Sequence, residues 1–328
     1  MAISSDLPPS RLTEFDLISR YFSPLAGKAG LGLLDDAACV QPQSGTDLII
    51  SKDMLVSGRH FFSDDAPENI GFKALSANVS DLAAKGAKPQ CYLLGLSLSP
   101  AVTNHEWLSA FAGGLAEAQK HYGIELVGGD TTATDGPLTI SITAFGGVKS
   151  GQMLKRSGAQ VGDDIYVSGT IGDASLALEA IESNKHNDDC FLERFHRPLA
   201  RTELGQKLIG IATASVDVSD GLLADIGHIC KASQVGAQVY QAEIPLSKAA
   251  EARVNKENSL WPRIWAGGDD YEIAFTAKPQ DRLKIKAVAQ NVGVLITRVG
   301  QIGTQKSVEL VDCSGELVQV GQQGYQHF

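Results

Sequence analysis

The sequence predicts a two-domain α/β protein of the α+β type. Its 328 residues are more than one domain usually holds. Short segments of β character alternate with amphipathic helical segments along the chain. A stretch rich in Gly, Lys and Ser, residues 146–162, contains few apolar residues and separates two such halves. We therefore expect an N-terminal domain at 1–148 and a C-terminal domain at 149–328.

The first half is predicted to contain both helices and strands, each for a local reason. Residues 11–22 place their apolar side chains on one side, and residues 138–145 alternate between apolar and polar. Pro67 is typical of a first helical turn, and Asn104 is a good N-cap. The expected helices are 11–22, Pro67 to about Lys85 and Asn104 to about His121, and the expected strands are 48–51, 91–98, 124–127 and 138–145.

The second half is predicted more coarsely. A strand at 165–168 should turn through Gly169–Asp173 into a helix. The other expected elements are helices at 201–213 and 220–235, strand character at 265–275 around a Gly-Gly turn, and short β segments from about Val292 to the C-terminal tail.

Two short motifs recur at the same offset of 139 residues. Val79-Ser80-Asp81-Leu82 returns as Val218-Ser219-Asp220-Gly221-Leu222, and Gly128-Gly129-Asp130 returns as Gly267-Gly268-Asp269. Two related halves facing one cleft would explain this. Coincidence among common turn residues explains it equally well, and both interpretations stay open.

Acidic side chains stand repeatedly where a hydrophobic run is expected to break into a turn. A single such Asp is usually a turn former or a helix cap, but six runs that all contain such an Asp are harder to explain in that way. Carboxylates that the fold gathers repel one another unless cations neutralise them, and Mg²⁺ prefers oxygen ligands together with substrate phosphates. The sequence therefore predicts a site for a Mg-bound polyphosphate, and the six runs are 34–36, 49–53, 78–81, 127–130, 216–221 and 266–270.

Composition and missing motifs exclude several classes of function. The net charge of −10 argues against a nucleic-acid surface. The five cysteines form no CxxC pair, so buried thiols in a reducing compartment are expected. The sequence shows no leader-like or bilayer-spanning stretch, and we expect a cytoplasmic protein without membrane or nucleic-acid partners.

Of the reaction classes considered, phosphoryl transfer assisted by metal ions and charged side chains is the one that the sequence still supports. A P-loop, the protein-kinase motifs and the G-x-S-x-G nucleophile motif are all absent from the sequence. Carboxylates on separate loops can hold several Mg²⁺ ions around a triphosphate, and Gly128-Gly129 lets backbone approach it closely. Arg156 is either a phosphate ligand or a solvated surface residue. Residues 217–221 form the sharpest motif, although a helix cap without a ligand has the same pattern.

Order and spacing of these motifs resemble the thiamine-monophosphate kinases, in the superfamily of aminoimidazole-ribonucleotide synthetase. The resemblance extends from about Thr13 to Phe328. The matching segments are 35–38, 53–61, 73–84, 128–132, 156–159, 167–173, 217–222 and 267–271. It implies an aminoimidazole-ribonucleotide synthetase-like fold and a homodimer joined through the N-terminal sheet. It also implies ATP-dependent, Mg²⁺-assisted phosphorylation of thiamine monophosphate to the diphosphate by direct transfer, without a phospho-enzyme.

The resemblance also implies roles for individual residues. Catalysis would depend on Asp53, Asp130 and Asp220. The positions matching the family's metal ligands are Asp36, Ser51, Lys52, Asp53, Asp81, Asp130, Asp217 and Asp220. Those matching nucleotide contacts are Gly129, Asp130, Arg156 and Ser219, and those matching thiamine-phosphate contacts are His60, Asp269 and Tyr325.

The chain departs from the family pattern at a few of these positions. Lys52 puts a cation beside a metal ligand, although its backbone carbonyl could still bind a metal. Leu34 replaces a Gly before the Asp pair, Asp269 replaces a Glu, and Tyr325 replaces a Trp. Two alternatives stay open at this stage: another ATP-using enzyme of the superfamily, of the ring-closing purine-synthesis type, or a non-catalytic protein that binds Mg-nucleotide.

Overall fold

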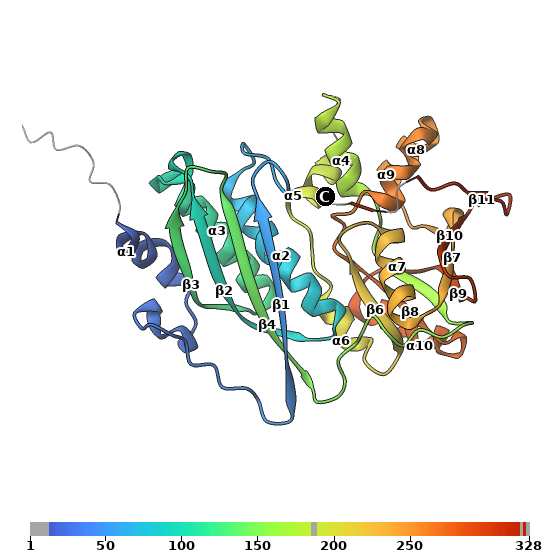
Figure 1. Ribbon diagram of the computed structural model, residues 1–328, viewed down its shortest axis with the longest axis horizontal. Coiled ribbons are helices and arrows are strands. Elements are labelled where there is room, and N and C mark those ends of the chain that lie inside the picture. Colours follow the sequence, from blue (N-terminus) through green and yellow to red (C-terminus); the bar gives the residue numbers. More distant parts are fainter. Residues whose placement is uncertain (1–12, 185–188, 322–323, 326–328) are drawn as a thin grey trace, which may run out of the picture.

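The computed structural model describes residues 13–184, 189–321 and 324–325. Two β-sheets, each with its own helices and hydrophobic core, lie side by side along the long axis of the molecule (Figure 1). The predicted α/β class with two domains is confirmed. Of the predicted helix at 11–22, the residues before Thr13 lie outside the described part of the chain.

The N-terminal domain is built on a four-stranded sheet with the order β1-β4-β2-β3. β2 pairs antiparallel with β4 and parallel with β3, and β4 pairs antiparallel with β1. Two long helices, α2 and α3, cover one face of this sheet, and in Figure 1 the strands lie in front of them. The elements are α1 (Glu14–Leu17), β1 (Thr46–Val56), α2 (Pro67–Ala84), β2 (Lys88–Leu98), α3 (His105–Tyr122), β3 (Glu125–Ala133) and β4 (Thr139–Lys149).

Helix α2 is the central element of the molecule. It begins with Pro67 in its first turn, and residues on all its sides are buried because it packs against the sheet, against α3 and against the C-terminal domain. Its contact with α3 is close. A Cβ on Gly114 of α3 would stand only 1.9 Å from the carbonyl oxygen of Glu68, so only glycine fits there.

The C-terminal domain is built on a seven-stranded sheet with the order β11-β10-β7-β9-β5-β8-β6. Two of its interior strands, β5 and β8, are buried along their whole length and carry apolar residues on both faces. The strands are β5 (Asp164–Ser168), β6 (Ala212–Val218), β7 (Gly236–Tyr240), β8 (Glu272–Ala277), β9 (Ile296–Gly303), β10 (Val308–Val311) and β11 (Leu317–Val318). The helices are α4 (Asp173–Glu182), α5 (Asp189–His196), α6 (Thr202–Lys207), α7 (Leu222–Ser233), α8 (Lys248–Lys256), α9 (Trp261–Ala266) and α10 (Arg282–Val292).

Several sequence predictions need correction. The predicted helix 201–213 is only α6, after which the chain enters β6. The segment 265–275 begins as the end of helix α9 and becomes a strand only at Glu272. Helices α5, α8 and α10 were not predicted. The N-cap of α3 is confirmed, since Oδ1 of Asn104 accepts a 2.9 Å hydrogen bond from the Trp107 N–H.

The interpretation of the two recurring motifs as structural repeats is wrong. Asp81 lies inside helix α2, whereas Asp220 follows a strand and precedes α7. Gly129 and Asp130 lie within strand β3, whereas Gly268 and Asp269 form a turn. Asp53 likewise lies within β1 rather than in a turn. Equal sequence spacing therefore does not reflect equal local structure here.

Candidate active site between the two domains

A cavity of about 570 Å³ opens between the domains and gathers predicted site residues from both. The N-terminal domain contributes its residues from β1, the following turn and α2, and the C-terminal domain contributes the loops after β6 and α9. The predicted residues along the cavity are Asp53, His60, Asp81, Arg156, Asp217, Ser219, Asp220, Asp269 and Tyr325.

Strand β1 aims its odd-numbered residues toward the helices. Asp53 lies on this side, and its backbone N–H donates a 2.9 Å hydrogen bond to Oδ1 of Asn78 on α2. The neighbouring Ser51 donates its hydroxyl to Oδ2 of Asp81. Helix α2 and strand β1 therefore present Ser51, Asp53 and Asp81 together.

Asp217 reaches the same place from the other domain. It lies near the end of β6, it is buried, and its Oδ2 accepts a 2.9 Å hydrogen bond from the Ser80 hydroxyl of α2. Burial, together with the charges of Asp81 and Asp225, raises the pKa of Asp217. Lys85 lies nearby and donates to the carbonyl of Ser215, and burial lowers its pKa.

The loop after Asp217 is held by a carboxylate that the sequence analysis missed. Oδ2 of Asp225 accepts hydrogen bonds of 3.1, 3.1 and 3.2 Å from the backbone N–H groups of Ser219, Asp220 and Gly221. Burial and the nearby Asp220 raise the pKa of Asp225 to about 7. The signal was available, because Asp225 falls in the first turn of the helix that this motif precedes.

The carboxylates make this cavity strongly acidic. Burial and the charges of Asp81 and Asp220 raise the pKa of Asp53 to about 6. One ligand atom from each of Asp220, Asp225 and His228 lies within 4.8 Å of the other two. The donors are nearly all hard oxygens, which is the ligand set that Mg²⁺ prefers. The residues present therefore fit magnesium, and a bound cation would relieve the repulsion among them.

A strained turn, residues 267–271, forms the other wall. Its backbone is tied to the loop after β6, because the N–H groups of Asp269 and Tyr271 donate 2.8 Å bonds to the carbonyls of Ser219 and Val218. Asp269 has φ +66°, and Tyr271 has φ +52°, which is unusual for residues other than glycine. A Cβ on Gly268 would stand 2.3 Å from the Ser219 carbonyl oxygen, so glycine is required there.

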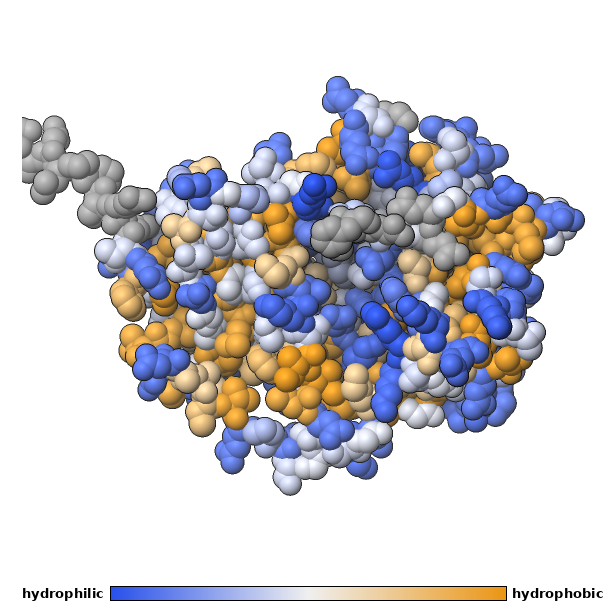
Figure 2. Space-filling model, in the orientation of Figure 1, coloured by the Kyte–Doolittle hydropathy of each residue, from blue (hydrophilic) through white to orange (hydrophobic). Residues whose placement is uncertain are grey.

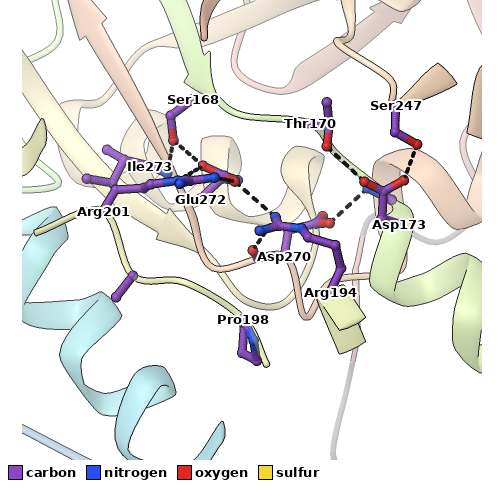
Figure 3. A network of polar contacts seen from close by, with 12 residues as sticks. Ser168, Thr170, Asp173, Arg194, Pro198, Arg201, Ser247, Asp270, Glu272 and Ile273 are labelled. Atoms are coloured by element: carbon purple, nitrogen blue, oxygen red, sulfur yellow. Dashed lines mark hydrogen bonds and ion pairs between the residues drawn. The ribbon is translucent and has the colours of Figure 1, made fainter. Parts of the chain in front are cut away.

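A buried polar network supports this turn from below (Figure 3). Arg194 and Arg201 converge on Glu272, whose Oε2 also accepts a 2.6 Å bond from Ser168. Burial opposes ionisation, but the hydrogen bonds and charges of the two arginines hold the pKa of Glu272 below its ordinary value. Asp270 accepts a 2.8 Å bond from the Gly172 N–H. This network fixes Asp270 and Glu272, which flank the end of the turn, and its residues do not line the cavity.

The remaining predicted residues border the same cavity. Nδ1 of His60 accepts a 3.0 Å hydrogen bond from the Val56 N–H, so the neutral ring carries its proton on Nε2. The Tyr325 N–H donates a 2.8 Å bond to the Asp220 carbonyl, which places this residue beside the acidic loop. The carbonyl of Arg156 accepts a bond from Ser233, so its loop is attached to α7.

Four predicted residues lie elsewhere within the chain. Asp36, Lys52, Gly129 and Asp130 line a second hollow of about 780 Å³ on the open face of the N-terminal sheet. Lys52 points away from Asp53, and its Nζ donates a 2.5 Å bond to Ser141. A Cβ on Gly129 would stand 1.9 Å from the Leu94 carbonyl oxygen, so strand packing already requires this glycine.

Asp130 and Asp53 are separated by the sheet itself. β4 and β2 stand between their strands, so at about 4.8 Å per strand they are roughly 14 Å apart. They also face opposite sides. Asp130 pairs with Gly95, Gly95 with Ser141, and Ser141 with Met54, which is exposed on the open face. A single chain therefore does not bring these two carboxylates together.

Comparisons with known proteins agree with this two-domain architecture. Residues 34–148 match the family model of the AIR synthase related protein N-terminal domain, and residues 160–313 match that of the C-terminal domain. The fold and the intervening acidic cavity thus define a protein of the AIR synthase related class. The chain is 38% identical to thiamine-monophosphate kinase of Escherichia coli K12, over 96% of this chain and 98% of that protein. It is 40% identical to the Haemophilus influenzae enzyme, over 88% and 89% of the two chains. The chain belongs to the thiamine-monophosphate kinase family.

Solved structures give the same result. The thiamine-monophosphate kinase of Stenotrophomonas maltophilia matches with a TM-score of 0.83 at 40% identity, covering 94% of this chain and 98% of that one. The complex of AaThiL with AMPPCP and TMP matches with a TM-score of 0.77 at 29% identity, covering 99% and 100%. Helices long and apolar enough to cross a membrane are not found in the part of the chain that the structure describes.

Proposed function

We propose that the chain transfers the γ-phosphoryl group of ATP to thiamine monophosphate, which yields thiamine diphosphate and ADP. The kinases to which it is similar carry this activity in their name, and the AaThiL complex holds AMPPCP and TMP in the same fold over the full chain. The observation that carries the proposal is the cavity between the domains. An acidic cluster suited to Mg-phosphate lines it together with His60, Asp269 and Tyr325, to which the resemblance to the family assigns contacts with the acceptor.

The acidic cluster would hold Mg²⁺ together with the phosphates. Bound magnesium supplies charge neutralisation and alignment for phosphoryl transfer. Within this chain the ligands would be Ser51, Asp53, Asp81, Asp217 and Asp220. Asp225 would act indirectly by holding the loop that carries Asp220.

The acceptor would lie against the turn and the C-terminal tail. Tyr325 has a partly exposed ring for the heteroaromatic part of thiamine, and Asp269 offers an anion to its cationic ring. His60, with its proton on Nε2, is a donor for the acceptor phosphate. An oxygen of that phosphate attacks Pγ while the bond from Pγ to the β–γ bridging oxygen breaks. The acceptor is already anionic, so a strong general base is unnecessary.

The nucleotide would be bound by Arg156 and Ser219 from this cavity and by Gly129 and Asp130 from the open sheet face. Since one chain keeps these groups apart, we propose that two chains together form each complete site. The second chain would then contribute Asp36, Gly129 and Asp130, whereas the backbone of Lys52 lies between Ser51 and Asp53 of the first chain.

The open sheet face supports such a homodimer. Leu48, Ile50 and Met54 of β1 are exposed there, at 40%, 58% and 52%. Figure 2 shows hydrophobic residues gathered over this sheet in the orientation of Figure 1. A contiguous apolar face of this kind is typical of a protein interface. We further infer a cytoplasmic enzyme, because all five cysteines are free thiols. The expectation that these thiols are buried is met by Cys91 and Cys230 and is wrong for Cys39, Cys190 and Cys313, which are exposed.

Chromatography of thiamine monophosphate incubated with the purified chain and ATP tests the proposal. Thiamine diphosphate is expected only in the sample that also contains Mg²⁺. If calorimetry shows that the chain binds Mg-ATP, but ATP is not converted to ADP with any acceptor supplied, the chain is a non-catalytic nucleotide-binding protein. Turnover of a purine precursor in place of thiamine monophosphate would identify the ring-closing alternative.

A further inference from the structure

Lys73 lies in an unusual place for a lysine. It stands in the middle of α2 and is only 2% exposed, although lysine is almost never fully buried unless it is paired. Its Nζ lies 2.5 Å from Oδ2 of Asp269, a residue of the other domain. The same Nζ lies 3.8 Å from the centre of the Phe195 ring, within the range of a cation–π contact.

Asp269 is held on more than one side. Its backbone is fixed by the bond from its N–H to the Ser219 carbonyl and by the left-handed φ of +66°. Its carboxylate interacts with the Tyr271 side chain as well as with Lys73. The Asp269 side chain nevertheless remains 29% exposed, and it borders the cavity. Lys73 therefore aims a carboxylate that still reaches the cavity.

We propose that Lys73 is a positioning residue for the acceptor: through its bond to the Asp269 carboxylate it keeps that group directed at thiamine monophosphate. This rests on the proposed function, in which Asp269 contacts the acceptor. Lys73 does not line the cavity and acts through Asp269. Because α2 belongs to the N-terminal domain, the acceptor pocket is completed only when the two domains are packed against each other.

The proposal predicts a selective loss of acceptor binding. Lys73→Met keeps the length of the side chain and its packing on Phe195 but removes the charge-assisted hydrogen bond. The KM for thiamine monophosphate should rise roughly ten- to a hundredfold, the range expected for a lost bond to a charged group, while the KM for ATP stays unchanged. Calorimetry with thiamine monophosphate alone should show the same loss. Lys73→Arg keeps the charge and should retain most of the affinity.

A double-mutant cycle with Asp269→Asn separates positioning from general damage. If Lys73 acts through Asp269, the double variant binds thiamine monophosphate no more weakly than Asp269→Asn alone. Asp269→Asn alone should also melt at a lower temperature, because it strands a buried ammonium, and adding Lys73→Met should reverse that loss. Glu117→Gln is the matched control. It removes a different ion pair, to Arg197, away from the cavity, and should leave both KM values unchanged.

Additive effects of the two substitutions, or an equal rise of both KM values in Lys73→Met, would overturn the proposal. The wild-type rate tests the proposed function separately. A wild-type chain without kinase activity refutes that function, whereas an active wild type with an unaffected Lys73→Met refutes only the role of Lys73.

Discussion

The hydroxyl of Ser80 donates a 2.9 Å hydrogen bond to Oδ2 of Asp217 and thereby joins the C-terminal part of α2 to the end of β6. These residues stand 137 positions apart in the sequence and belong to different domains. Since both are buried, the bond is protected from water. The two domains are therefore joined at the same point where their carboxylates meet, and movement of one domain against the other would alter the geometry of the acidic cluster.

Asp53→Asn should separate activity from stability. Turnover should fall to background, because an amide replaces a proposed metal ligand at the centre of the cluster. Folding raises the pKa of Asp53 from 3.8 to about 6, so the folded protein binds more protons than the unfolded chain between these values. The metal-free wild type therefore loses stability as the pH rises through this window. The metal-free variant lacks this titrating carboxylate and does not lose this stability. Its free energy of unfolding at pH 8, measured by chemical denaturation, should exceed that of the metal-free wild type by up to about 3 kcal/mol. Wild-type turnover in the variant would refute the metal role.

Asp225→Asn tests how the loop after β6 is held. An asparagine at this position retains only one acceptor oxygen and adds a donor group opposite three backbone N–H groups. The amide protons of residues 219–221 should exchange faster, and kcat should fall by roughly tenfold, in line with the loss of a charged hydrogen bond. Asp312→Asn is the control, because Asp312 accepts similar N–H bonds in an exposed turn away from the cavity. Equal exchange in the Asp225 variant and the wild type would contradict this account.

Arg156→Ala should weaken nucleotide binding selectively. If the guanidinium contacts phosphate oxygens, its loss should raise the KM for ATP roughly ten- to a hundredfold and leave the KM for thiamine monophosphate nearly unchanged. Steady-state kinetics with each substrate varied in turn measures this. Lys284→Ala removes an exposed cation of α10 and should change neither constant. An unchanged KM for ATP would identify Arg156 as a surface residue.

Mixing two inactive variants tests whether the site is shared between chains. Asp130→Asn and Asp217→Asn should each be inactive alone. If Asp130 of one chain serves the site of its partner, a mixed dimer contains one site with both substitutions and one with neither. With random exchange of chains, about a quarter of the wild-type activity should return. No recovery, under conditions where mass spectrometry detects mixed dimers, would show that each chain carries its own complete site.

Ile50→Glu tests the interface itself. A charge on the open sheet face should convert the proposed dimer into a monomer, as measured by light scattering after size-exclusion chromatography. Because the substituted side chain points away from α2, the monomer should remain folded. Leu283→Glu is the control, since Leu283 is also exposed to solvent but lies on α10. A wild-type chain that is already monomeric would refute the dimer directly.

Local sequence patterns predicted correctly those features that depend only on neighbouring residues of one helix or strand. The cap at Asn104 and the buried run of β5 depend on neighbouring residues, and both were predicted. Strand character at 265–275 failed because Trp261 and Pro262 begin a short helix that packs in the C-terminal core. The run 78–81 was expected at a turn, but Asp81 also lies inside the predicted helix from Pro67 to about Lys85, and the structure confirms that helix as α2.

The sequence by itself determined the class of protein, its two domains and its excess of carboxylates over cationic side chains. It also determined that the motifs follow the order found in the thiamine-monophosphate kinases. The tertiary structure alone decided which of these residues meet. It brought Asp53, Asp81, Asp217 and Asp220 together from two domains, buried Lys73 against Asp269, and left Asp130 on the opposite face of a sheet. The physical reason is that the face on which a strand residue lies depends on the alternation of side chains and on the order of the strands in the sheet. Contacts between domains depend in turn on how the two cores pack. Local sequence patterns specify neither the strand order nor this packing.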